Sequence, residues 1–129
     1  MKVEHRKFKG NAAGKHTEML VPCNSQYKQT GVKTTAEKLV HSMYLSNTCT
    51  SAVPCSVFLR KRNKRISYSP AEPANVAGNF DIYIIKDISI PANTSLEILS
   101  DFKYDYNFHL MFTITGSESL TLDMIFKYE

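Results

Sequence analysis

Apolar and polar residues alternate with a period of two along the last quarter of the chain. The alternation covers Tyr104–Ile114, breaks at Gly116–Ser119 and resumes over Leu120–Tyr128. Successive side chains of a strand point to opposite faces, so each run predicts a strand with one buried and one solvent-facing side. The short break predicts that the two runs form a terminal β-hairpin. In this register Phe112 is expected in the core and His109 in solvent.

The middle of the chain carries further strand signals. Apolar residues of one parity in Leu39–Leu45 and Val53–Leu59 predict a second hairpin. The longest run is Phe80–Ile90, where a lysine interrupts the apolar parity and predicts a bulge or bend near Lys86–Asp87. The segment Pro91–Thr94 has the composition of a turn.

These signals add up to about seven or eight strands, and no stretch shows a convincing helical period. The predicted fold class is therefore all-β, an antiparallel β-sandwich that is jelly-roll-like. At 129 residues the chain has room for one hydrophobic core. Residues 1–35, which are weakly patterned and contain glycine breaks, are expected to form an N-terminal arm or edge segment. Residues 36–129 are expected to form the β-sandwich domain.

Charge is distributed unevenly. Residues 1–65 hold 13 Lys and Arg against 3 Asp and Glu, a net of +10, whereas residues 66–129 hold 3 against 9, a net of −6. This asymmetry suggests head-to-tail association, in which the basic part of one copy meets the acidic part of the next. The alternative is that strands of both halves interleave, so that the charges mix in the folded protein.

Basic residues near residue 60 and in the N-terminal segment are the candidate partner-binding residues. They are Arg60, Lys61, Arg62, Lys64 and Arg65, together with Lys2, Arg6 and Lys7. Such a run can contact nucleic acid phosphates, dock on an acidic protein surface or be a solvated loop. Only Phe58 and Tyr68 flank it as stacking partners for bases, so protein contact is favoured over nucleic acid.

No motif for nucleotide binding, metal-dependent proteolysis or serine hydrolysis occurs in the sequence. We therefore expect no enzyme activity, no catalytic residue, no metal site and no cofactor. The N-terminus lacks a signal-peptide pattern and no apolar run is long enough to span a membrane. Cys23, Cys49 and Cys55 are accordingly expected to be reduced thiols in a cytoplasm, with a Cys49–Cys55 disulfide as the alternative.

Several segments together resemble small structural proteins of tailed bacteriophages that infect marine and freshwater bacteria, including the cyanophage type. The carrying segments are Met43–Thr48, Ser51–Leu59, Ile84–Leu99 and Leu120–Glu129. The most specific of them is the turn and strand around Ile90-Pro91-Ala92-Asn93-Thr94. The basic run at residues 60–65 and the following loop are longer than in that pattern, and the first 35 residues have no counterpart in it.

The resemblance implies a non-enzymatic virion component present in many copies and assembled in the host cytoplasm. Other virion proteins are the implied partners, and a ring or another symmetric homo-oligomer is expected. A neck, tail or adaptor position is the first expectation, and capsid decoration is the second. Two further alternatives are a small nucleic-acid-binding β-domain that uses residues 60–65, and a receptor- or sugar-binding module.

Overall fold

The structure of the protein is a computed structural model that describes residues 1–24, 34–61 and 80–129. These residues form eight strands, and no helix is present among them. The strands are β1 (Lys2–Lys9), β2 (Lys15–Val21), β3 (Glu37–Asn47), β4 (Val53–Lys61), β5 (Phe80–Ile90), β6 (Thr94–Asp105), β7 (His109–Thr115) and β8 (Thr121–Tyr128).

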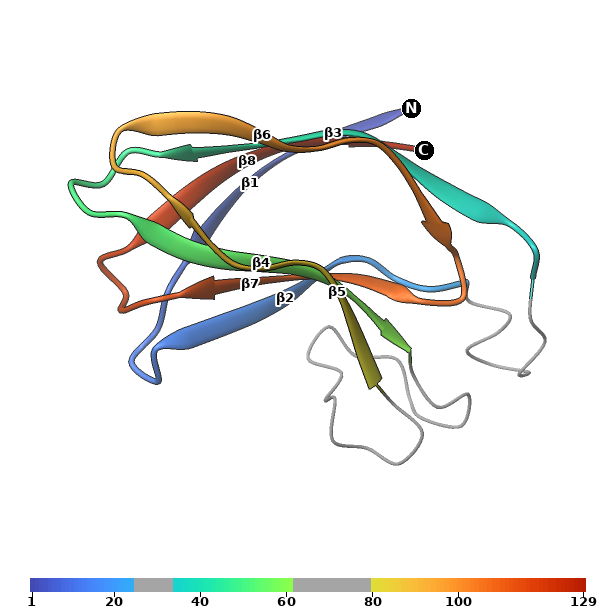
Figure 1. Cartoon of the computed structure of the whole chain (residues 1–129), viewed down its shortest axis with the longest axis horizontal. Coiled ribbons are helices and arrows are strands. Elements are labelled where there is room, and N and C mark those ends of the chain that lie inside the picture. Colours follow the sequence, from blue (N-terminus) through green and yellow to red (C-terminus); the bar gives the residue numbers. More distant parts are fainter. Residues whose placement is uncertain (25–33, 62–79) are drawn as a thin grey trace.

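The strands build two four-stranded sheets that pack face to face (Figure 1). The first sheet has the order β1-β8-β3-β6 and the second has the order β2-β7-β4-β5, with every neighbouring pair antiparallel. This arrangement of eight strands is the jelly roll, in which two antiparallel sheets pack against each other. The predicted all-β sandwich is confirmed, and its strand order is that of a jelly roll.

Both predicted hairpins are wrong, because the strands concerned lie in different sheets. β7 is hydrogen-bonded to β2 and β4, whereas β8 is hydrogen-bonded to β1 and β3. β3 and β4 are separated in the same way. Among the described strands, β4 and β5 are the one pair of neighbours in sequence that also pair in a sheet. The connections after β3 and β7 therefore cross between the sheets.

The alternating segment from Tyr104 is also not one continuous strand. β6 ends at Asp105, whose Oδ1 accepts a hydrogen bond of 2.8 Å from the backbone N–H of Asn107 and one of 2.7 Å from its side-chain amide. Such a carboxylate bond two residues ahead closes a turn. The chain reverses there, and β7 begins at His109 in the other sheet.

The core lies between the sheets and is built from the inward-facing residues of both. In β8 the predicted parity is confirmed, since Leu122, Met124 and Phe126 are fully buried. β7 departs from the prediction because both of its faces are covered. Phe112 faces the main core, while Met111 packs against Met19 and Phe58 in a second cluster on the outer face of the β2-β7-β4-β5 sheet.

His109 is buried, contrary to the expectation that it faces solvent. Its Nδ1 accepts a hydrogen bond of 2.8 Å from the backbone N–H of Cys23, which follows β2. The imidazole therefore ties the end of β2 to the start of β7. The Nδ1 atom of this polar residue is hydrogen-bonded to the backbone of a distant segment rather than to water.

The predicted bulge in β5 is confirmed. Ser56 of β4 lies opposite both Lys86 and Asp87, so β5 carries one extra residue there, and a second register shift follows between Val57 and Phe58. Asp87 adopts a φ of 52°, and its backbone N–H donates a hydrogen bond of 2.8 Å to the Ser56 hydroxyl. The predicted turn after β5 is also present, with Asn93 at a φ of 54° between β5 and β6.

The N-terminal segment is an integral part of the sandwich. β1 pairs along its whole length with β8, and β2 pairs with β7. Both β1 and β2 are edge strands of the sandwich, and they do not form a separate arm. The boundary expected at residue 35 corresponds to no break in the sheets, because β2 and β3 both contribute to the common core.

Candidate functional site

Arg60 is buried and paired, so it is not the free cation that a partner-binding loop requires. It lies in β4 directly opposite Asp81 in β5. Its Nε is 2.7 Å from Asp81 Oδ1, and its terminal nitrogen is 3.1 Å from Asp81 Oδ2. The two side chains are 10% and 16% exposed, and the guanidinium also lies 5.1 Å from the centre of the Phe58 ring. This two-point ion pair joins β4 to β5.

Lys61 ends β4 and is half-buried, with its Nζ 5.5 Å from the centre of the Phe80 ring. Arg62, Lys64 and Arg65 lie outside the described residues. The described part of the basic run therefore contributes one structural arginine and one lysine at the end of a strand.

The N-terminal cations lie on β1, an edge strand of the other sheet, so they are separate from Arg60 and Lys61, the described part of the basic run. Lys2 is exposed. Arg6 bonds to Glu4 at 2.9 Å and donates a hydrogen bond of 3.2 Å to the backbone oxygen of Met19, which links the two sheets. Lys7 forms an exposed ion pair with Asp123 of β8 at 2.8 Å.

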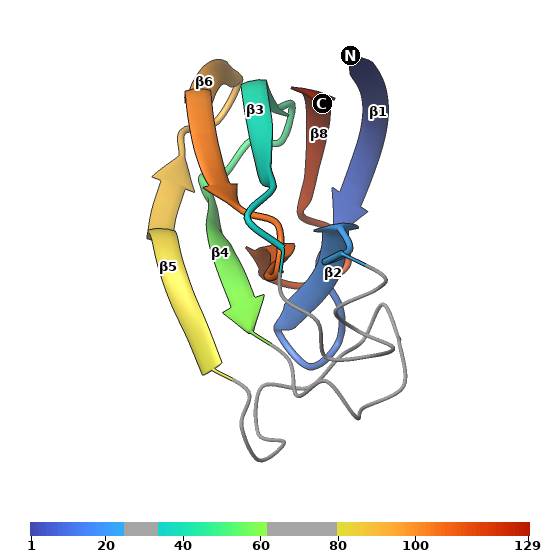
Figure 2. The same ribbon diagram turned by 90° about the vertical axis from the view of Figure 1, so that its right-hand side faces the viewer.

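The two flanks of the sandwich carry opposite charge. We call β1 with β2 the basic flank and β5 with β6 the acidic flank; Figure 2 shows them on opposite sides of the sandwich. The basic flank holds five Lys and Arg against two Glu, a net charge of +3. The acidic flank holds two Lys against five Asp and Glu, a net charge of −3. Strands of the two halves interleave, as the alternative expected, since β8 lies between β1 and β3 and β7 lies between β2 and β4; a charge difference remains between the outermost strands.

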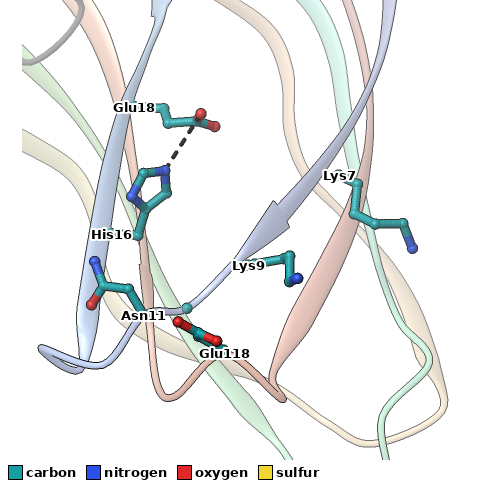
Figure 3. A pocket seen from close by; sticks show the side chains of 7 residues that line it. Lys7, Lys9, Asn11, His16, Glu18 and Glu118 are labelled. Atoms are coloured by element: carbon teal, nitrogen blue, oxygen red, sulfur yellow. Dashed lines mark ion pairs between the residues drawn. The ribbon is translucent and has the colours of Figure 1, made fainter.

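An open hollow of about 440 Å³ lies at the corner between β1 and β2 (Figure 3). Its lining combines Lys7 and Lys9 with Glu18 and Glu118, and His16 Nε2 lies 3.4 Å from Glu18 Oε1. Figure 3 shows Lys7 directed away from the His16–Glu18 pair. Charges of both signs face the same hollow, so it has no clear preference for an anion or a cation.

A smaller recess of about 130 Å³ lies on the outer face of the β2-β7-β4-β5 sheet. Hydroxyl groups of Thr17, Ser56 and Thr113 line it. The Thr17 and Thr113 hydroxyls bond to each other at 2.8 Å, and the Ser56 hydroxyl is engaged by Asp87. These groups are satisfied within the fold and stabilise the pairing of neighbouring strands.

No protein-family model matches the sequence, and no curated protein matches it.

Within residues 1–24, 34–61 and 80–129, no group of three or more His, Cys, Asp or Glu side chains is placed to hold a metal ion. No disulfide joins Cys23, Cys49 and Cys55 in the part of the chain that the structure describes. Burial raises the pKa of Cys55 to about 12, which keeps it protonated and poorly nucleophilic at neutral pH. In the same ranges no helix is long and apolar enough to cross a membrane.

The sequence did not localise the charge difference between the two flanks. The densest basic run of the sequence lies near residue 60, whereas the structure places unpaired cations along the edge at β1. Lys2 and Lys9 there form no ion pair among the described residues. The uneven charge of the two halves was the available signal, and the strand order was needed to interpret it.

Proposed function

We propose that the protein is a non-enzymatic structural component of a tailed bacteriophage particle, present in many copies and bound to neighbouring virion proteins. The observation that carries the proposal is a jelly-roll scaffold with two oppositely charged, open-edged flanks. Jelly rolls recur in viral coat proteins, where a rigid sheet core presents edges and loops to neighbours. A neck, tail or adaptor position is the first choice, and capsid decoration is the second.

The segment with the most specific resemblance to phage structural proteins supports this proposal. Ile84–Leu99 forms the end of β5, the turn at Asn93 and the first half of β6. It therefore builds the corner that joins the two sheets on the acidic flank. A segment that forms both an inter-sheet corner and a charged edge suits a part that is fixed between neighbours.

The nucleic-acid alternative has less support from the described residues. Asp81 neutralises Arg60, and Glu4 and Asp123 accompany Arg6 and Lys7. Phe58, the stacking partner next to the basic run, is 2% exposed. Base stacking needs an accessible aromatic face, so this ring is not a platform for single strands. We expect weak, salt-dependent DNA binding in a filter assay, with a Kd on the order of micromolar or poorer. Nanomolar affinity at physiological salt would promote the alternative.

Purified phage particles provide the direct test. Mass spectrometry of particles purified from infected cells should detect the chain in several copies per particle, quantified against the major capsid protein. Antibodies against the exposed Ser117–Ser119 segment should then locate it at the neck or tail in electron micrographs. A non-structural phage protein that is abundant in the lysate and absent from particles is the control. Presence in the lysate together with absence from purified particles would contradict the proposal.

A further inference from the structure

Within residues 1–24, 34–61 and 80–129, no strand pairs with the outer side of either flank. Among the described strands, β1 is bonded to β8 alone and β6 to β3 alone. The outer side of each of these strands therefore presents backbone N–H and C=O groups to whatever lies beside the sandwich. The same holds for β2 and β5 in the second sheet. Adding a strand from another chain to such an edge is a common mode of protein association.

Charge discriminates between the ways in which two copies can meet. Contact between two basic flanks brings Lys2 and Lys9 of one copy near the same residues of the other, and contact between two acidic flanks does the same for Glu97 and Asp101. Like charges on paired strands are destabilising, so both symmetric arrangements are disfavoured. A basic flank against an acidic flank pairs net charges of +3 and −3 instead.

Strand direction is compatible with the same arrangement. Neighbours in each sheet are antiparallel and each sheet has four strands, so β1 and β6 run in opposite directions. A second copy placed beside the first in the same orientation therefore brings its β1 antiparallel to the β6 of the first. The antiparallel alternation continues across the contact without a reversal, and β2 and β5 follow the same rule in the second sheet.

Apolar side chains accompany the charges at both edges. Val3 on β1 is 49% exposed, while Leu96 on β6 and Ile82 on β5 are 36% and 46% exposed. Lys2 and Lys9 on the basic flank, and Glu97 and Asp101 on the acidic flank, form no ion pair among the described residues. Each flank thus offers apolar area together with charges that are available to a neighbour.

We infer that a second copy of this chain docks its basic flank on the acidic flank of the first. This inference rests on the multi-copy role proposed above and deepens it by naming the partner and the surface. The contact joins two different surfaces, so it repeats from copy to copy and closes into a ring when the rotation between copies allows it. The charges select this head-to-tail contact over a two-fold dimer.

Removing the native charge of one flank at a time tests the inference. One variant carries Lys2→Glu and Lys9→Glu, so that both flanks are acidic. The other carries Glu97→Lys and Asp101→Asn, where asparagine is chosen because residue 101 has a φ of 49°. Light scattering after size exclusion should give a discrete oligomer for the wild-type chain and the monomer mass of 14.6 kDa for each variant. Circular dichroism should show that both variants keep the wild-type sheet signal.

Mixing supplies the decisive control. The second variant keeps the +3 flank and the first keeps the −3 flank, so an equimolar mixture should form a one-to-one complex of about twice the monomer mass, and high salt should dissociate it. A monomeric wild-type chain, a closed two-fold dimer, variants that assemble like wild type or a mixture that stays monomeric would each overturn the inference. If the chain is present in particles but fails these tests, this interface alone is refuted. If the chain assembles in solution but is absent from particles, the virion role alone is refuted.

Discussion

Truncation of Phe112 is expected to remove a large part of the stability of the sandwich. Its ring is fully buried on the inner face of β7, and its centre lies 4.5 Å from that of Phe8, which belongs to the other sheet. Phe112→Ala empties a site that links the two sheets across the core. Such substitutions cost about 3–5 kcal/mol. For a domain of this size that corresponds to a fall in Tm of roughly 12–20 °C.

Urea unfolding followed by tyrosine emission and circular dichroism measures this loss, since the chain has no tryptophan. A double-mutant cycle with Phe8→Leu and Phe112→Leu should give a coupling of about 0.5–1.5 kcal/mol for the ring pair. Ile125→Ala is the matched control, because this apolar strand residue is 42% exposed and should cost about 0.5 kcal/mol or less. A loss below about 1 kcal/mol for Phe112→Ala, or an equal loss for the control, would refute the assigned core.

Three further predictions concern pH, a turn and a thiol. Burial raises the pKa of Cys55 and of Tyr128 to about 12 from 9.0 and 10.0, so the folded chain keeps protons that the unfolded chain has lost. The resulting stabilisation is complete below pH 9 and is lost as the pH rises towards 12; urea midpoints that stay constant from pH 8 to 12 would contradict it. Asn93→Gly should be nearly neutral, whereas Asn93→Val should cost about 1–2 kcal/mol because of the positive φ, and equal urea midpoints would argue against the turn. Cys55, which is fully buried, should react with iodoacetamide far more slowly than the partly exposed Cys49, as read by peptide mass spectrometry; equal rates would disagree with the burial of Cys55.

The sequence predicted the strands far better than it predicted their partners. Alternation reports which face of a strand is apolar, and in β8 this was sufficient because one face meets the core and the other meets solvent. It carries no information on which strand lies alongside. The short break at Gly116–Ser119 therefore resembled a hairpin loop, although it crosses from one sheet to the other.

Two failures have a local physical cause. Alternation cannot reveal that the outer face of β7 is itself covered, so Met111 and His109 were assigned to solvent-facing positions. The density of positive charge near residue 60 likewise gave no hint that Asp81, twenty-one residues later, lies opposite Arg60 and neutralises it. Both features depend on contacts between strands that are distant in sequence.

The position of β8 has a consequence for how the chain acquires its fold during synthesis. β8 lies between β1 and β3, so the first sheet has a vacant centre until residues 121–128 have left the ribosome. A nascent chain that lacks this strand leaves β1 without its neighbour and exposes the apolar faces of both halves. We therefore expect the first sheet to form only after β8 has been translated, and a nascent chain that stops before residue 121 to expose apolar surface that is prone to aggregation.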